Sequence, residues 1–192
     1  TYANGQLVKN LTAQNGEEVT IKAQWTPNTY TVSYAGNGNT AGLAPTAPVS
    51  CTYDSDCVAP NNTYVKTGYV FAGWKCTGGT TACDGDIIGE GASLKNVSTG
   101  APITLTAQWG QNTYMIAFDA NKPDTASSDV SETMANMSMT YDVAKNLTEN
   151  AYKLTGWTFT GWMDSDGNEY ANGQSVNNLA TDDGATFTMT AQ

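Results

Sequence analysis

The 192-residue chain carries 8 lysines and arginines against 18 aspartates and glutamates, a net charge of −10 at pH 7, and it contains no histidine. A negative chain whose eight basic residues are all lysines argues against nucleic-acid and anionic-lipid partners. The sequence therefore predicts no enzyme, because the commonest general base is missing, no cofactor, and no membrane insertion of this segment, because its apolar runs are short.

Residues 1–25 end in Val-Thr-Ile-Lys-Ala-Gln-Trp, a stretch that alternates apolar and polar side chains. Such alternation predicts a strand with one buried face, here at 19–25. The same pattern returns 84 residues later, at 103–109, and a third time at 187–191. A period of this length indicates tandem small domains, each large enough to hold a modest core.

The period divides the chain into three parts. Residues 1–25 are the C-terminal part of a preceding repeat, residues 26–109 are a complete repeat, and residues 110–192 are a repeat that lacks only its final tryptophan. We therefore expect the chain to be a stretch of a longer array. Because 25 residues cannot bury a core alone, residues 1–25 should complete a unit with residues upstream or pair with another chain by strand addition.

Inside the complete unit, an alternating strand around 30–34 is followed by a second strand at 50–54. A polar segment at 60–67 then offers the unit's one place for a helix, at most a short one. The aromatic box Gly-Tyr-Val-Phe-Ala-Gly-Trp follows at 68–74, and the last unit repeats it as Gly-Trp-Thr-Phe-Thr-Gly-Trp at 156–162.

The linkers between units are very short. Four residues separate Trp25 from Tyr30, and four separate Trp109 from Tyr114. Each residue spans at most about 3.3–3.6 Å, so neighbouring units must nearly touch. We expect a semi-rigid rod rather than a flexible string of beads.

Aromatic residues recur at fixed positions in the units. Alternation places neighbouring members on one face, so we expect them to fill cores rather than to form sugar-stacking platforms. The expected core aromatics are Trp25, Tyr69, Phe71, Trp74, Trp109, Trp157, Phe159 and Trp162.

The motifs of the complete unit together resemble a known repeat family. They read NTYTVSYAGNG at 28–38, TYD at 52–54, TGYVFAGW at 67–74 and LTAQW at 105–109. This combination is similar to the Listeria–Bacteroides repeat family, the B-repeat type of internalin B. The resemblance implies an α+β, mostly β, fold made of small β-grasp (ubiquitin-like) repeats of about 84 residues. It also implies large secreted bacterial surface proteins, often adhesins, and no shared catalytic site.

Four cysteines, which the usual family pattern lacks, lie in the complete unit as Cys51, Cys57, Cys76 and Cys83. An even number in a chain of extracellular character indicates two disulfides, for which three pairings exist. We favour Cys51–Cys57 with Cys76–Cys83, because the intervening residues read as turns that bring the paired Cα atoms together. A zinc site is the alternative, but CxxC spacing and histidine are both missing.

A weak calcium candidate lies in Asp-Ser-Asp-Gly-Asn-Glu at 164–169, with oxygen ligands on Asp164, Asp166 and Asn168. The distal glutamate of a twelve-residue calcium loop is replaced by Ser175. A hairpin turn, with Asp and Asn in their favoured places, is the preferred interpretation, so no metal is expected.

The sequence thus favours a non-enzymatic extracellular array on a bacterial cell surface, acting as an adhesin stalk or a surface-fibre segment. Its partners would be neighbouring repeats or other copies of the chain. The alternative is that the repeats bind a host glycoprotein or glycan directly, through variable loops at 35–49, 76–92 and 119–137.

Overall fold

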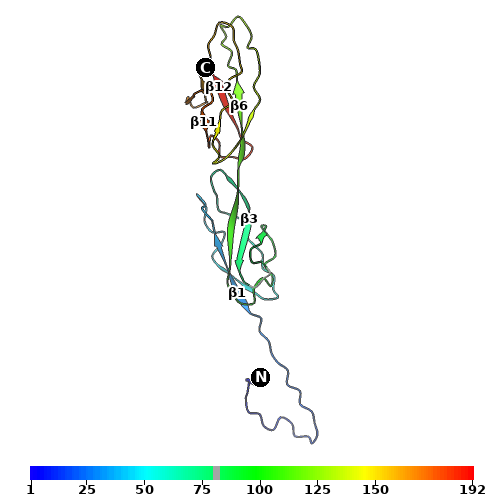
Figure 1. Cartoon of the computed structure of the whole chain (residues 1–192). Helices are drawn as coiled ribbons and strands as arrows, with labels where there is room; N and C mark the ends of the chain where they lie inside the picture. Colours follow the sequence, from blue (N-terminus) through cyan, green and yellow to red (C-terminus); the bar gives the residue numbers. More distant parts are fainter. Residues whose placement is uncertain (80–82) are drawn as a thin grey trace.

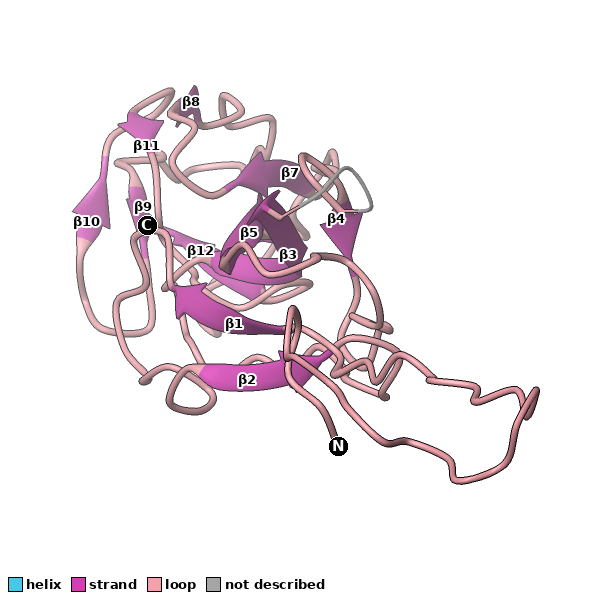
Figure 2. Cartoon of the chain, turned by 90° about the horizontal axis from the view of Figure 1, so that it is seen from below, coloured by secondary structure: helices cyan, strands magenta, loops and turns pink. Residues whose placement is uncertain are grey.

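The computed structural model describes residues 1–79 and 83–192, and in this part of the chain it contains two five-stranded sheets and no helix. The molecule is elongated: residues 1–28, the first sheet and the second sheet follow one another along its length (Figure 1). Figure 2 looks along this axis from the N-terminal end. Each sheet has its own cluster of buried residues, so the two do not share one interior.

The first sheet has the strand order β2-β1-β5-β3-β4. Its strands are β1 (Thr29–Ala35), β2 (Val49–Thr52), β3 (Tyr69–Gly78), β4 (Ile87–Ile88) and β5 (Ile103–Gln111). The central pair, β1 and β5, is parallel, and the other pairs are antiparallel. We call residues 29–111 unit 1.

The second sheet has the equivalent order β7-β6-β12-β9-β10, with β6 and β12 as its parallel pair. Its strands are β6 (Thr113–Asp119), β7 (Met137–Thr140), β9 (Trp162–Met163), β10 (Glu169–Tyr170) and β12 (Thr186–Ala191), and β8 (Lys145–Asn146) pairs separately with β11 (Ser175–Val176). We call residues 113–192 unit 2. The two units are therefore two copies of one topology.

Alternation along the strands builds each core. In β1, Tyr30 and Val32 are buried while Thr29 and Thr31 are exposed. The closing strand β5 buries Ile103, Leu105 and Ala107 in the same way. The matching residues of unit 2 are Tyr114, Ile116, Phe118, Met189 and Ala191. The strands predicted at 30–34, 103–109 and 187–191 are thus confirmed.

The expected α+β class is wrong, although the mostly β character stands. A β-grasp fold needs a helix across the sheet between the second and third strands, and the segment 53–68 contains only turns, bends and isolated bridges. Asn62 explains part of this: its Oδ1 accepts from Tyr64 N at 2.9 Å and its Nδ2 donates to Tyr64 O at 2.9 Å. Such side-chain bonds offer the backbone an alternative to helix, and Asn150 repeats them on Tyr152 in unit 2.

The strand expected at 19–25 is also absent, and Trp25 is 90% exposed rather than in a core. Among the described residues, no hydrogen bond joins residues 1–25 to either sheet. An alternating segment forms a stable strand only beside a partner strand and a facing apolar layer, and neither lies next to it here. Figure 2 shows this segment looping away from both sheets.

Candidate functional site at the junction of the two units

A single residue, Asn112, separates β5 from β6, and the two strands run almost as one through the molecule (Figure 1). Its backbone groups serve both units. Asn112 N donates to Gly68 O of unit 1 at 2.9 Å, and Asn112 O accepts from Tyr141 N of unit 2 at 2.9 Å. Asn112 is 7% exposed, and its Nδ2 donates to Thr181 O at 2.6 Å. The linker is therefore held from both sides.

Two tyrosines pack across the junction. The rings of Tyr69 in unit 1 and Tyr141 in unit 2 meet edge to face, with centroids 5.9 Å apart. The Tyr69 hydroxyl donates to Asp142 Oδ2 at 2.7 Å, and Gln111 Nε2 donates to Tyr141 O at 2.7 Å. Lys66 Nζ lies 4.1 Å from the centroid of the Tyr69 ring, a cation–π contact on the unit 1 side.

Gly68 is a steric requirement of this contact. Its φ is +77°, in the left-handed region that favours glycine. A Cβ on Gly68 would overlap the ring of Tyr141. The close approach of the two units therefore depends on glycine for its backbone angle and for its missing side chain.

Hydrogen bonding holds Asp142 in its charged form. The bonds from Tyr69 and Asn178 keep the pKa of Asp142 below its ordinary value, while the bond to Asp142 raises the pKa of Tyr69. Asn178 Nδ2 donates to Asp142 Oδ1 at 2.8 Å, and Asp142 N donates to Asn178 Oδ1 at 2.6 Å. Asp142 is thus already oriented by its own unit when it accepts the hydrogen bond from the Tyr69 hydroxyl. This arrangement fixes the two units against each other. It does not pair a nucleophile with a general base.

Tyr69 is expected in a core from the sequence, and no role is predicted for Tyr141 and Asp142. The sequence does mark these two positions as recurrent, because Thr-Tyr-Asp occurs at the same place in both units, at 52–54 and 140–142. Recurrence alone could not separate a core residue from one that meets the next unit, because both recur once per unit.

The other predicted aromatics divide between core and surface. Trp74 and Trp162 are 0% and 1% exposed, and each packs against a phenylalanine of its box. Phe71, Phe159 and Trp109 are partly buried against these cores. The expectation for Trp157 is wrong, since it is 50% exposed. It occupies the position of Tyr69 in the aromatic box, and no following unit lies against it in the structure.

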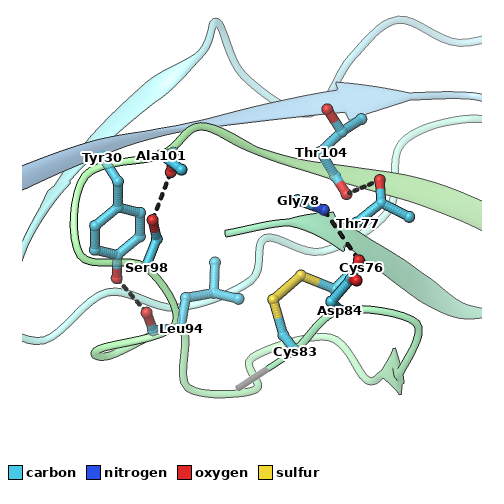
Figure 3. Close-up of a disulfide and its surroundings, with 10 residues drawn as sticks. All are labelled: Tyr30, Cys76, Thr77, Gly78, Cys83, Asp84, Leu94, Ser98, Ala101 and Thr104. Carbon is cyan, nitrogen blue, oxygen red and sulfur yellow. Dashed lines mark hydrogen bonds between the residues drawn. A yellow bond between two sulfur atoms is a disulfide. The ribbon is translucent and has the colours of Figure 1, made fainter. Parts of the chain in front are cut away.

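Both disulfides form with the favoured pairing, Cys51–Cys57 and Cys76–Cys83, with Cα atoms 5.9 and 5.6 Å apart. Figure 3 shows Cys76–Cys83 joining β3 to the loop that follows it, beside the bond of 3.2 Å from Gly78 N to Asp84 Oδ1. Three of the four cysteines are buried in the unit 1 core. Residues 80–82, which lie between Cys76 and Cys83 in the sequence, are outside the described residues.

Asp164 closes the turn after β9. Its Oδ1 accepts from the backbone N–H groups of Asp166 and Asn168, and its Oδ2 accepts from Asn168 Nδ2 and the Tyr170 hydroxyl, all at 2.9 Å. Both carboxylate oxygens thus face protein donors, the arrangement of a turn rather than of an ion cage. In the part of the chain that the structure describes, no group of three or more His, Cys, Asp or Glu is placed to hold a metal ion.

The Asp164 network predicts a loss of unit 2 stability in acid. The Asn168 side chain is the main cause that lowers the pKa of Asp164 to about 2 from 3.8. A depressed pKa contributes stability above about pH 4 that is lost as the pH falls towards 2. We expect Asp164→Asn to be less stable at pH 7 and to flatten this loss, as followed by the unit 2 indole signals in NMR. Asp124→Asn, at an exposed carboxylate of the same unit, should keep the wild-type slope; equal slopes for all three proteins would contradict the assignment.

Comparison with known proteins gives a consistent family match. The family described as the Listeria-Bacteroides repeat domain matches residues 30–108 and again residues 114–182. A protein of Evansella cellulosilytica named a Gly-rich membrane protein is 34% identical over 124 residues, 63% of this chain and 13% of that protein. A second protein of this organism, named a membrane protein, is 38% identical over 99 residues, 50% of this chain and 14% of its own length.

The chain therefore spans only a small part of these relatives. No solved structure matches it. Among the residues that the structure describes, no helix has the length and apolar character to cross a membrane.

Proposed function

Because the chain belongs to the Listeria-Bacteroides repeat domain family, we propose that it is a non-enzymatic, extracellular segment of a bacterial cell-surface protein. It acts as a stalk that carries an adhesin's binding part away from the cell, or as a segment of a surface fibre. The names of the two relatives support a surface-associated protein. Two disulfides support an oxidising, extracellular environment.

The observation that carries this proposal is the junction. A stalk needs units in series whose relative orientation is held, because freely jointed units would collapse into a coil. Here a single residue, Asn112, links the two sheets, and its backbone is hydrogen-bonded to Gly68 of unit 1 and to Tyr141 of unit 2. Tyr69 and Gln111 of unit 1 also contact unit 2 through hydrogen bonds and ring packing. The net charge of −10 adds mutual repulsion that opposes collapse and aggregation.

Three measurements test the proposal. Residual dipolar couplings should give one alignment tensor for both units, and small-angle scattering should give the maximum dimension of the extended two-unit body. Antibodies against the chain should label intact cells of the source bacterium. Unrelated tensors for the two units would overturn the stalk function, as would a chain found only inside cells.

Direct binding of a host glycoprotein or polysaccharide is the second candidate. The observation in its favour is a hollow in unit 2 lined partly by residues of the variable loop 119–137 and by exposed Trp157, a residue type that stacks on sugars. Tight, saturable binding of the chain on a glycan array, lost in Trp157→Ala, would favour it over a purely mechanical role.

A further inference from the structure

The chain enters and leaves unit 1 through two strands that lie side by side. It enters β1 at Thr29 and leaves β5 at Gln111, and these strands are the parallel pair at the centre of the sheet. Because the strands are parallel, the start of β1 and the end of β5 lie at opposite ends of the unit. Tension along the chain therefore pulls β1 and β5 in opposite directions along their own axes, which shears the pair.

Shear strains the whole pairing at once. The register joins residues 32–35 of β1 to residues 103–106 of β5. Hydrogen bonds bridge the gap between neighbouring strands, so strands that slide past each other distort all of these bonds together. A hairpin that is pulled open from its ends would instead lose one pair after another. The topology thus places a resistant pairing between the two points where tension reaches the unit.

The core holds the same two strands from below. Val32 of β1 and Ile103 and Leu105 of β5 are buried, and the Tyr30 hydroxyl donates a hydrogen bond to Leu94 O beneath the sheet. Sliding β1 along β5 would have to drag these side chains through a closely packed interior. Side-chain packing therefore opposes the same movement as the strand pairing.

Two asparagine side chains tie the ends of the pair. Before β1, Asn28 Nδ2 donates at 2.8 Å to Thr99 O, in the segment that leads into β5. After β1, Asn37 Nδ2 donates at 2.9 Å to Ala107 O of β5. Each of these bonds, which we call ties, joins the β1 side of the pair to the β5 side, and one lies at each end of β1.

Unit 2 repeats the pair and its ties. β6 and β12 are parallel, with residues 115–119 opposite 186–190. Asn112 Nδ2 donates at 2.6 Å to Thr181 O before β6, and Asn121 Nδ2 donates at 2.8 Å to Ala191 O after it. The disulfides of unit 1 take no part in this arrangement, because they join β2 and β3 to the residues that follow those strands.

We propose that each unit is a mechanical module whose resistance to stretching resides in its parallel pair and the two ties. Tension passes from β1 across to β5, through Asn112 into β6 and across to β12, along the length of the molecule (Figure 1). The disulfides lie off this path, so they stabilise unit 1 against heat without raising the force at which it unfolds. The proposal rests on the stalk function, because a stalk is pulled between the cell and a bound surface.

Single-molecule force spectroscopy of the whole chain tests the path with two directions of pulling. Held at its two ends, the chain should shear the pair of unit 1. Held through azide-bearing residues placed at the exposed positions Thr26 and Ser55, it should peel β1 from β2, beginning at Thr29 and Thr52. Shearing should need roughly two to four times the force of peeling, because four register pairs share the load rather than one. Equal forces would overturn the proposal.

Reduction of the disulfides identifies the unfolding step of unit 1. The bridges close 6 and 7 residue positions and span 5.9 and 5.6 Å, so reduction should lengthen this step by about 30–35 Å at about 3.3–3.6 Å per residue. The unit 2 step should keep its length, because unit 2 contains no cysteine.

The force at which reduced unit 1 unfolds, measured well below its melting temperature, should equal that of the oxidised protein. Contacts that persist in the transition state of unfolding do not change the unfolding rate, and the bridged loops persist while the pair separates. A lower force after reduction would place the disulfides on the path of tension and contradict the proposal.

The ties are tested by substitution at two exposed asparagines. Asn28→Ala removes the first tie, and Asn37→Gly removes the second while it keeps the positive φ of residue 37. At constant force, each should raise the unfolding rate of unit 1 about fivefold, the effect of one net hydrogen bond, and leave unit 2 unchanged.

Asn62→Ala is the matched control, because the Asn62 side chain bonds to the backbone of Tyr64, away from the parallel pair. It should lower the melting temperature of unit 1 and leave its unfolding rate under force unchanged. Equal acceleration by Asn62→Ala and the two tie variants would overturn the role of the ties. None of these failures would touch the stalk function, since that is tested by the orientation of the units within an unstretched chain.

Discussion

Replacing Gly68 by alanine is expected to release the two units from each other. The new Cβ would overlap the ring of Tyr141, so Tyr69 and Tyr141 could no longer pack and the bond from Asn112 N to Gly68 O would lengthen. Both units should remain folded, because their cores are separate. Nitrogen-15 relaxation should then report shorter rotational correlation times for each unit, approaching those of single domains.

Gly156→Ala is a closely matched control. Gly156 occupies the same position of the aromatic box in unit 2, with φ +83° against +77° for Gly68. Both substitutions therefore carry the backbone cost of a left-handed alanine, about 1–2 kcal/mol. A Cβ on Gly156, however, would have no atom within 4 Å. Independent tumbling in both variants, or in neither, would show that the Tyr141 contact does not hold the units together.

The sequence predicted those features of the fold that depend on residues close together in the chain. Period-two alternation identified β1, β5 and β12, because burial against one sheet face is a local property that the residues record directly. The spacing of the cysteines identified the disulfides, since bridges between cysteines 6 and 7 positions apart depend on nearby residues only.

Alternation failed where the outcome depended on a neighbour. Residues 19–25 have the pattern of β5 but form no strand, because a strand also needs partners that lie elsewhere in the sequence. Trp157 and Tyr69 hold one position in two copies of the box, yet Tyr69 meets unit 2 while Trp157 is half exposed. A repeat pattern shows that a position matters; which unit uses it is a property of the assembled array.

Reducing both disulfides is expected to destabilise unit 1 alone. They close loops between residues 6 and 7 positions apart, which in the chain-entropy account contributes about 2–3 kcal/mol each. A domain of this size has a total stability of only about 5–15 kcal/mol, so a loss of about 4–6 kcal/mol removes a large part of it. The melting temperature of unit 1 should fall by more than about 15 °C.

Unit 2 provides the control within the same molecule, because it contains no cysteine. The indole signals of Trp74 and Trp109 report on unit 1, and those of Trp157 and Trp162 report on unit 2, so one NMR melt with and without reductant separates them. Unit 2 also shows why the bridges are local staples. Where unit 1 has Cys76 two residues after Trp74, unit 2 has Asp164 two residues after Trp162, and its four hydrogen bonds close the turn. If reductant lowered the melting of both units equally, or of neither, the stabilisation of unit 1 by its disulfides would be refuted.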